Sequence, residues 1–385
     1  MQRYLNENYN KNFTVSNKLE KSDVYIITVG TPIKNNKKPD LSILEKSVID
    51  ICPYLKRDDL IILRSTVSIG STRNIVSKLI EKKTNFKFGK DIFLAFCPER
   101  TIEGKAMEEL KKLPQIVGGY CKKSSEIAKR IFGEYNYTVI EVENLEAAEL
   151  CKLIDNTYRD TVFAYSNQIS KLTEKLNLNL VEIIDKVNLA YERNVIPKPS
   201  PGVGGPCLSK DPYIIYDNFL KNGITSNNLI LNSRKLNERM VKDIFFRIKN
   251  NLFKLKKKKT AKIFISGFTF KGYPETTDIR GSTTVDLLKY LKKSKFTNIW
   301  GHDFKLSASE IGKLGVKYTS IHNGFKNADA ILIMNNNIRY QDLKLSSLIK
   351  SSKKPLFFYD SWQIYNPIEI KNIQGVVYGS VGYNS

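Results

Sequence analysis

Cys207 lies in the segment of the sequence whose residue types point most directly to chemistry. The segment reads Gly202-Val-Gly-Gly-Pro-Cys-Leu-Ser-Lys-Asp-Pro212, and its glycines allow the backbone to approach a ligand closely. Proline after Asp211 predicts that a helix begins here, with Asp211 as its N-cap. A thiol beside a helix N-terminus, with Lys210 nearby, is a usable nucleophile. A free cysteine can equally be a buried apolar residue, so this segment alone leaves both interpretations open.

Two further groups of polar residues could take part in catalysis. Lys152 and Asn156 are four residues apart in a stretch with helical periodicity, which puts both on one helix face, where they could stabilise an oxyanion. The segment Cys97-Pro-Glu-Arg-Thr-Ile-Glu-Gly104 places Glu99 and Glu103 in a turn after an apolar run. A solvated surface pair and an exposed loop would show the same two patterns.

The composition is that of an ordinary globular protein, with 385 residues, 41% of them hydrophobic, enough for two or three domains. No apolar run approaches the roughly 18–20 residues of a membrane span, and the N-terminus has no secretory signal pattern. The five cysteines form no CxxC pair, which argues against a disulfide scaffold or a zinc site. We therefore expect a cytoplasmic protein with no bound metal and no membrane partner.

The net charge of +23 requires an interpretation. Lysine is spread along the whole chain, and its densest run, at residues 254–259, follows a helical pattern, where lysines are favoured near the helix C-terminus. No nucleic-acid recognition motif accompanies the charge, so we expect no nucleic-acid partner. A field that favours an anionic diphosphate substrate is the better interpretation.

Apolar runs alternate with helical patterns in the first part of the chain, which indicates an α/β sheet. Residues 23–29 predict a strand buried on both faces, as in a parallel sheet, and a helix is expected from residue 41 to about 55 with Asp40 as its N-cap. A second helical stretch is expected at about 72–83. Further strands are expected at residues 60–63, 92–96, 115–118 and 138–141.

The rest of the chain is helical to about residue 250, interrupted by a Pro/Gly-rich segment at 197–206, and then returns to α/β. Strands are expected there at residues 261–267, 298–303 and 330–334. We predict an α/β fold with two Rossmann-like domains, the first incomplete, joined by a central helical region. The expected domains are residues 1–143, 144–240 and 241–385.

Together these segments resemble the UDP-glucose/GDP-mannose dehydrogenase family, whose members use NAD to oxidise a nucleotide sugar at C6. The matching blocks include the Lys152/Asn156 helix and the Cys207 loop, and they cover nearly all of the chain in family order. The Cys97-Pro-Glu-Arg100 variant is most similar to members that act on N-acetylhexosamines, such as UDP-N-acetylmannosamine dehydrogenase. The other blocks are Val29-Gly-Thr-Pro32, Ser65-Thr-Val67, Pro98-Glu99, Gly267-Phe-Thr-Phe-Lys-Gly272 and Asp278-Ile-Arg-Gly-Ser282.

The resemblance implies a mechanism in which the C6 alcohol becomes an aldehyde, Cys207 attacks it, and the resulting thioester is hydrolysed to a uronic acid. It implies catalytic roles for Cys207, Lys152, Asn156, Asp211, Glu99 and Thr66. It implies that NAD contacts Val29, Gly30, Thr31, Pro32, Ser65, Thr66, Val67, Glu103 and Arg280. It implies that the UDP-sugar contacts Glu99, Lys152, Asn156, Arg193, Gly202, Gly204, Phe270 and Lys271. Arg193 would reach a neighbouring subunit's substrate in a homodimer formed by the central helices, and the product would serve surface polysaccharide synthesis.

The sequence departs from the family pattern near its start. No Gly-x-Gly-x-x-Gly turn precedes Asp23, although such a turn normally binds the NAD pyrophosphate at a helix N-terminus. A truncated gene product, a degenerate paralogue and a chain that borrows the unit from another polypeptide would all account for this. The expected alternative to an active dehydrogenase is therefore a nucleotide-sugar-binding remnant with impaired catalysis.

Overall fold

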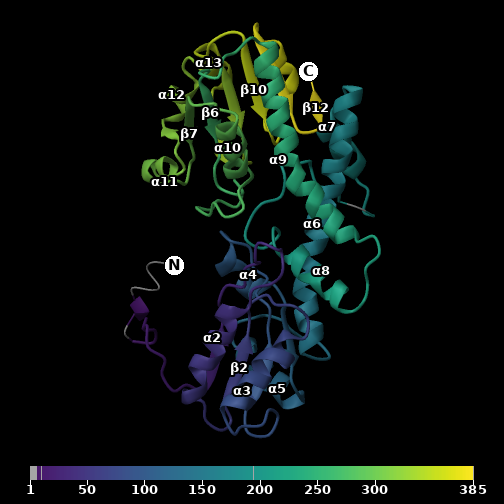
Figure 1. The fold of residues 1–385 in the computed structure, drawn as a ribbon, viewed down its shortest axis with the longest axis vertical. Helices are drawn as coiled ribbons and strands as arrows, with labels where there is room; N and C mark the ends of the chain where they lie inside the picture. The colour runs from purple at the N-terminus through teal and green to yellow at the C-terminus, as the bar shows by residue number, and fades with distance from the viewer. Residues whose placement is uncertain (1–6, 10, 194, 385) are drawn as a thin grey trace. The chain divides into compact units, whose positions relative to one another are not determined.

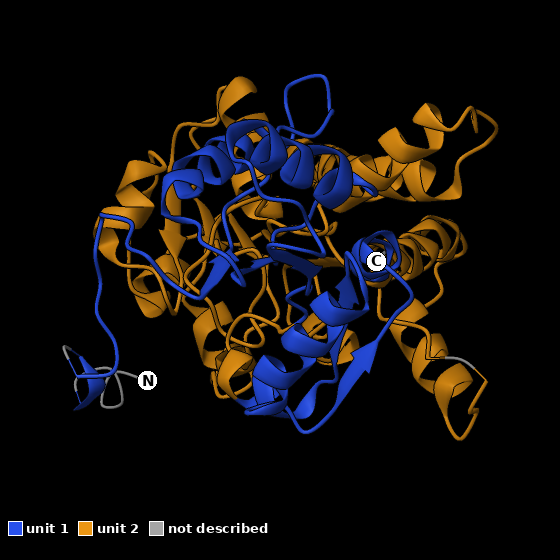
Figure 2. Cartoon of the chain, turned by 90° about the horizontal axis from the view of Figure 1, so that it is seen from below, with its two compact units in different colours: residues 1–100, 108–152 blue, residues 101–107, 153–385 orange. Residues whose placement is uncertain are grey.

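The chain folds into two compact units in a computed structural model that describes residues 7–9, 11–193 and 195–384 (Figure 1). Unit 1 comprises residues 1–100 and 108–152, and unit 2 comprises residues 101–107 and 153–385 (Figure 2). Each unit contains a sheet with helices packed on both faces. The α/β fold predicted from the sequence is confirmed.

The sheet of unit 1 has the strand order β1-β2-β3-β4-β5. Its strands are β1 (Val24–Ile27), β2 (Leu60–Leu63), β3 (Phe93–Phe96), β4 (Gln115–Gly119) and β5 (Val139–Glu141). Strands β1 to β3 are parallel to one another and β4 is parallel to β5, but β4 runs antiparallel to β3. The parallel arrangement expected from the buried apolar runs is therefore broken once, between β3 and β4.

Strands β2 and β3 are buried on both faces, as their continuous apolar sequences predict. Alternate residues of β2 enter two separate apolar layers, one through Ile61 and Leu63 and the other through Leu60 and Ile62. The same expectation is wrong for β1, where Ile26 is 48% exposed. The physical reason is that β1 is the edge strand of the sheet, so one of its faces is only partly covered.

The helical segments of unit 1 are α2 (Ser42–Ile51), a 3₁₀ turn (Cys52–Tyr54), a π-helical turn (Thr72–Ser77), α3 (Lys78–Lys83), α4 (Ala106–Lys112) and α5 (Lys122–Gly133). Helix α4 begins in the segment 101–107 that belongs to unit 2. The prediction that Asp40 is the N-cap of α2 is wrong, because Leu41 occupies that position. The Asp40 carboxylate instead accepts a hydrogen bond of 3.1 Å from the Ser42 backbone N–H, in the local turn that leads into the helix.

The main part of unit 2 begins within the 32-residue helix α6 (Leu145–Leu176), which carries both Lys152 and Asn156. The helix starts where the Asn144 side chain accepts a hydrogen bond from the Ala147 backbone N–H. Three further helices follow α6 before the first strand of this unit: α7 (Leu180–Asn188), α8 (Asp211–Lys221) and α9 (Leu229–Lys254).

The sheet of unit 2 has the strand order β12-β11-β10-β9-β6-β7-β8, and only β12 is antiparallel to its neighbour. Helices α9 and α10 cover one face and the shorter helices α12, α13 and α14 cover the other. The strands are β6 (Ile263–Ser266), β7 (Ile299–His302), β8 (Lys317–Tyr318), β9 (Ala330–Ile333), β10 (Leu356–Asp360), β11 (Val376–Ser380) and β12 (Tyr383–Asn384). The helices are α10 (Thr283–Lys293), α11 (Ala308–Lys313), α12 (Ile321–Phe325), a 3₁₀ turn (Ile338–Tyr340), α13 (Leu345–Lys350) and α14 (Pro367–Lys371).

Candidate active site

Residues 202–211, which we call the Cys207 turn, lead directly into helix α8. Cys207 is exposed to solvent. Its carbonyl oxygen accepts hydrogen bonds of 3.0 Å from the backbone N–H groups of Lys210 and Asp211, which fold these residues into a tight turn. The thiol therefore lies on an ordered turn immediately before a helix, as the sequence pattern predicted.

The prediction that Asp211 is the N-cap of α8 is wrong, because Asp211 is the first residue of the helix and Lys210 occupies the cap position. The Asp211 carboxylate is fully buried and is bound by two other side chains. Asn156 Nδ2 donates to one oxygen at 2.5 Å, and Lys210 Nζ donates to the other at 2.7 Å. Both carboxylate oxygens are thus fixed by side-chain donors.

The glycines of the Cys207 turn allow it to pack tightly against the segment 267–282. A Cβ on Gly204 would lie 2.3 Å from the Gly281 carbonyl oxygen, and a Cβ on Gly205, whose φ is +91°, would lie 2.8 Å from the Phe270 ring. Side chains at these positions would force the two segments apart. The structure therefore brings together the Cys207 turn and Phe270, which the sequence placed in separate blocks.

Arg280 lies in the same part of unit 2 and pairs with the Asp278 carboxylate at 2.7 Å. Its hydrogen bonds to Asp278 raise the pKa of the guanidinium, and the negative charge of Glu103 contributes in the same direction. Glu103 itself accepts a hydrogen bond of 2.5 Å from the Thr276 hydroxyl, while its carbonyl oxygen accepts one from Lys271 Nζ. Arg280, Glu103 and Lys271 therefore belong to one local network.

Within the part of the chain that the structure describes, no contact joins Arg193 to this network. Its guanidinium is exposed and lies 5.7 Å from the centre of the Tyr191 ring. A role for Arg193 in a neighbouring subunit's site stays a prediction.

In unit 1, two loops meet at the carboxyl ends of β1 and β2, and we call residues 29–32 and 65–67 the hydroxyl edge. The Thr31 hydroxyl donates to the Thr66 carbonyl oxygen at 2.5 Å, and the Ser65 hydroxyl donates to the Val29 carbonyl oxygen at 2.6 Å. Val67 is buried, whereas Gly30 and Pro32 are exposed. Two reciprocal bonds thus fix the loops and leave Gly30 open to solvent.

Glu99 and Lys152 also lie together in unit 1. Lys152 Nζ donates to the Glu99 carbonyl oxygen at 2.5 Å, and the Glu99 carboxylate pairs with the Arg64 guanidinium. Arg64 is a residue whose role the sequence did not reveal. Its position directly before Ser65 was the one available signal.

Glu149 is a second residue missed from the sequence. Its buried carboxylate, on the first turns of α6, accepts hydrogen bonds from the backbone N–H groups of Gly70 and Thr72 and from the Thr72 hydroxyl, at 2.5–2.8 Å. Burial raises the pKa of Glu149 to about 7 despite these donors. The residue fastens the turn that follows the hydroxyl edge to the helix that carries Lys152.

Comparison with known proteins identifies the family to which this chain belongs. Residues 1–136, 146–239 and 264–367 match the NAD binding, central and UDP binding domains of the UDP-glucose/GDP-mannose dehydrogenase family. The chain is 32% identical over 338 residues to the UDP-N-acetyl-D-mannosamine dehydrogenase of Methanococcus aeolicus, and the match covers 86% of this chain and 72% of that protein. The chain belongs to this family.

A second sequence comparison and a structural comparison support this assignment to a family of NAD-dependent dehydrogenases. Identity to the UDP-N-acetyl-D-mannosamine dehydrogenase of Methanocaldococcus jannaschii is 38% over 269 residues, which span 69% of this chain and 59% of that relative. The solved UDP-D-ManNAc dehydrogenase of Pyrococcus horikoshii superposes with a TM-score of 0.84 at 28% identity, covering 94% of this chain and 82% of that structure.

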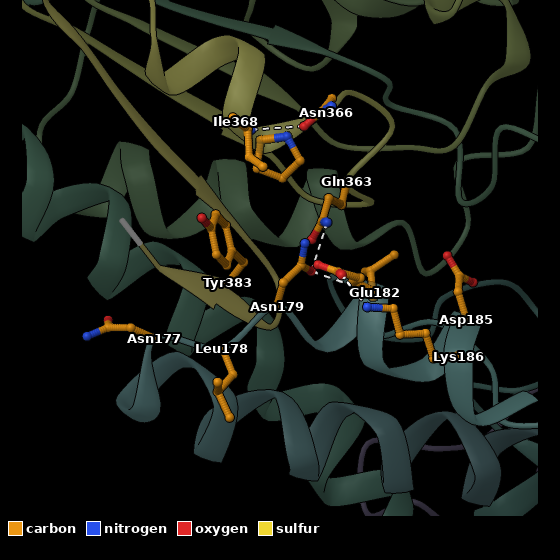
Figure 3. Close-up of a pocket in the computed structure, with 12 residues that line it drawn as sticks. Asn177, Leu178, Asn179, Glu182, Asp185, Lys186, Gln363, Asn366, Ile368 and Tyr383 are labelled. Atoms are coloured by element: carbon orange, nitrogen blue, oxygen red, sulfur yellow. Dashed lines mark hydrogen bonds and ion pairs between the residues drawn. The ribbon is translucent and has the colours of Figure 1, made fainter.

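Unit 2 also contains a cavity of about 650 Å³, and Cys207 is not among the residues that line it (Figure 3). It is lined mainly by α7 and by residues near α14 and β12. Within it, Gln363 Nε2 donates to Asn179 Oδ1 at 2.9 Å, and Lys186 pairs with Glu182 at 2.7 Å. These polar groups bind one another, so we place the chemistry at the Cys207 turn instead.

Among the residues that the structure describes, no three or more His, Cys, Asp or Glu side chains cluster as metal ligands would. Within the same described ranges, none of the helices is long and apolar enough to cross a membrane.

Proposed function

We propose that this chain catalyses the NAD-dependent oxidation of the C6 alcohol of a UDP-N-acetylhexosamine, in two steps, to the uronic acid. The observation that carries this proposal is the buried Asp211 carboxylate, held by Asn156 and Lys210 directly after the exposed thiol of Cys207. A nucleophile, a fixed proton acceptor and an amide donor thus lie within one small region. Family membership adds the NAD and UDP binding domains.

The hydroxyl edge fits the nicotinamide dinucleotide. Parallel strands end there, which is where α/β sheets bind ligands, and a Cβ at Gly30 would meet no atom within 4 Å. The side chains of Thr31 and Ser65 are occupied in holding the loops, so backbone groups and the Thr66 side chain would face the cofactor. When bound, NAD supplies the hydride acceptor for both oxidations.

In the first oxidation, C6 loses a hydride and its hydroxyl loses a proton, which gives the aldehyde. Asp211, whose carboxylate is held in place by Lys210 and Asn156, accepts the proton through a water molecule. In the second oxidation, the Cys207 thiol adds across the aldehyde C=O, its sulfur bonding to carbon and its proton passing to the oxygen, which forms a thiohemiacetal. Loss of a second hydride and of the hydroxyl proton then gives the thioester.

The thioester is hydrolysed by water, which returns the thiol of Cys207 and releases the carboxylate. Asn156 Nδ2 carries two N–H groups, so it can hold Asp211 with one and an oxyanion with the other. Lys152 supplies a positive charge for the same oxyanion. Glu99, supported by Arg64, and Thr66 position the attacking water.

The substrate assignment to a UDP-N-acetylhexosamine, with UDP-N-acetylmannosamine first, is supported by the relatives named above and by one from Ralstonia nicotianae named NDP-N-acetyl-D-galactosaminuronic acid dehydrogenase, 28% identical. A uronic acid of this kind would serve surface polysaccharide synthesis. We place the enzyme in the cytoplasm, where its five free cysteines would stay reduced. We retain three domains, at 1–143, 144–240 and 241–385, because each contains one of the matched ranges.

We further propose a homodimer formed through one face of α6. The apolar side chains on this face are spaced 4, 7, 7 and 4 residues apart, which is the pattern of a single helical stripe, and all are more than half exposed. Such a stripe is typical of a covered interface. The residues are Ile154, Tyr158, Tyr165, Leu172 and Leu176. The variant Tyr165→Lys should give a monomer in light scattering, whereas Tyr137→Lys, which alters an exposed tyrosine of unit 1, should not.

The activity is tested by incubating the purified chain with NAD and UDP-N-acetylmannosamine, and with UDP-glucose for comparison. We expect two NADH for each uronic acid formed, with the hexosamine preferred. UDP binding without NADH formation from any of these sugars would contradict the proposal and favour a nucleotide-sugar-binding remnant, which none of the comparisons supports.

A further inference from the structure

Arg234 is among the largest fully buried side chains of the described structure, although it is charged. It projects from helix α9, and its side chain is 1% exposed. A lone arginine in a helical sequence is ordinarily solvated, so its burial requires partners for the charge and for several N–H groups. Both kinds of partner are present in unit 2.

The charge of Arg234 is matched by Asp160 on α6. Arg234 Nη1 donates to Asp160 Oδ1 at 2.9 Å, and Asn237 Nδ2 donates to the same oxygen at 2.9 Å. Asp160 is fully buried, and burial raises the pKa of its carboxyl to about 6. Glu238 adds a second carboxylate 3.7 Å from Arg234 Nε. The cation is thus fixed in the interior by groups on two helices.

The other donors of Arg234 reach the Cys207 turn. Nη1 donates to the Leu208 carbonyl oxygen at 2.9 Å, and Nη2 donates to the Val203 carbonyl oxygen at 3.0 Å. These two carbonyls flank the segment Gly204-Gly-Pro-Cys207. One planar guanidinium therefore bridges both ends of the four residues that end at Cys207.

The glycines of the turn and the shape of the guanidinium make this bridge specific to arginine. The segment contains two glycines, of which Gly205 has a φ of +91°, so its own backbone restricts it little. Lysine carries its charge at a single point and cannot bond two separated carbonyls in the fixed directions that a guanidinium offers. The guanidinium thus adds a directional restraint at both ends of the segment, beyond the backbone bonds of Cys207 and the packing against Phe270.

We propose that Arg234 is a positioning residue that holds the thiol of Cys207 in the orientation needed to attack the aldehyde. This inference rests on the proposed dehydrogenase function. It assigns to Asp160 and Asn237 the task of fixing the arginine, and it predicts that the second oxidation depends on Arg234 more than the first, since only the second uses the thiol as nucleophile.

The test compares Arg234→Lys with the wild-type enzyme in two assays, using UDP-N-acetylmannosamine and its 6-aldehyde as substrates. We expect kcat for aldehyde oxidation to fall by about 10-fold to 100-fold, the scale expected when a reacting group is misplaced by about 1 Å. The KM for the UDP-sugar and the rate of alcohol oxidation should change by less than about threefold, so trapped aldehyde should accumulate. An equal loss in both steps, or no loss in either, would overturn the proposal.

Arg247→Lys is the matched control. Arg247 lies on the same helix and is also largely buried, but its partners are Glu174 and the Ser380 carbonyl oxygen. It should lower stability without changing the ratio of the two oxidation rates. Asp160→Asn, which keeps the shape of the carboxylate and can still accept from Arg234, serves as a milder second variant and should shift the ratio in the same direction as Arg234→Lys.

Hydrogen exchange separates this inference from the proposed function. The backbone amides of Gly204, Gly205, Cys207 and Leu208 should exchange at least about tenfold faster in Arg234→Lys than in wild type. Their exchange should be unchanged in Arg247→Lys. If the wild-type chain forms no NADH, the proposed function fails while this exchange result still reports on the bridge. Unchanged exchange in Arg234→Lys would contradict the bridge even in an active enzyme.

Discussion

The hydroxyl edge of unit 1 and the Cys207 turn of unit 2 are held by different kinds of interaction. At the hydroxyl edge, neutral hydroxyls bond to carbonyl oxygens, as Thr31 does to Thr66. At the Cys207 turn, charged side chains hold both the carboxylate of Asp211 and the backbone, through Lys210 and Arg234. A neutral bond contributes about 1 kcal/mol, and one to a charged group contributes more.

This difference fits the tasks that we propose for the two regions. A cofactor is recognised by many weak contacts along its length, so no single side chain at its site has to dominate. A nucleophile and a proton acceptor have to be held within a fraction of an ångström of one orientation, and buried charged groups provide that rigidity. Substitutions should therefore have much larger effects at the Cys207 turn than at the hydroxyl edge.

The largest effect is expected from Cys207→Ala. Loss of the nucleophile should lower uronic acid formation by on the order of 10³-fold or more, while the first oxidation should still give one NADH and an aldehyde. Product analysis by mass spectrometry checks the result. Cys121→Ala, which alters a partly buried thiol of unit 1, is the control and should behave as wild type. Uronic acid from the Cys207→Ala variant at the wild-type rate would remove the thioester from the mechanism.

Asn156→Ala is expected to have the next largest effect. It removes an oxyanion donor and one of the two partners of Asp211, so kcat should fall on the order of 100-fold. The loss should be greatest for aldehyde oxidation and thioester hydrolysis, which stopped-flow NADH measurement and acid quenching can separate. Asn222→Ala, at the exposed C-terminal end of α8, controls for general effects. A change in KM alone would show that Asn156 binds substrate without acting on the transition state.

Much of the fold could be predicted from the sequence because local patterns determine it. Continuous apolar runs such as Leu60-Ile-Ile-Leu63 predicted the buried strands β2 and β3, and the helical periodicity after residue 145 predicted α6. The direction of β4 could not be predicted, since an apolar strand has the same sequence pattern in either orientation. The exposure of β1 depends on its place at the sheet edge, which no residue within it encodes.

The site was predicted less completely, and the reason is long-range pairing. The pattern Asp211-Pro212 is typical of a capping aspartate, but Asn156, 55 residues earlier, binds this carboxylate. Arg64, Glu149 and Arg234 are single charged residues whose sequence neighbours give no sign of burial. Their roles emerge only when a partner from another element is placed beside them.

Glu149, which holds the turn that follows the hydroxyl edge, gives a prediction about how stability depends on pH. Its carboxylate has only neutral donors at Gly70 and Thr72, and burial raises its pKa from 4.5 to about 7. The folded state thus prefers the protonated form. Its stabilising contribution is complete below about pH 4.5 and is lost as pH rises through 7, which amounts to roughly 3 kcal/mol.

Urea unfolding at pH 4.5 and pH 8 measures this effect. The wild-type free energy of unfolding should fall between these two values by about 3 kcal/mol more than that of Glu149→Gln, which cannot ionise. Glu126→Gln, which alters an exposed glutamate of α5, is the control and should keep the wild-type slope. Parallel slopes for wild type and Glu149→Gln would show that folding does not raise the pKa of Glu149.

The smallest effect is expected from Thr31→Val at the hydroxyl edge. The variant loses one neutral hydrogen bond to the Thr66 carbonyl oxygen, which lowers stability by about 1 kcal/mol. Because Ser65 still bonds to the Val29 carbonyl oxygen, the loops should keep their path, and KM for NAD should rise by only about fivefold with kcat nearly unchanged.

Thr84→Val is the matched control, since the Thr84 hydroxyl also donates to a carbonyl oxygen, that of Ile80, but away from the hydroxyl edge. It should lower stability by a similar amount and leave the KM for NAD unchanged. If Thr31→Val lowered kcat as strongly as Asn156→Ala, the hydroxyl edge would have to position a reacting group as tightly as the Cys207 turn does. The difference between neutral hydrogen bonds at one region and charged side chains at the other would then not distinguish a cofactor-binding region from a catalytic one in this chain.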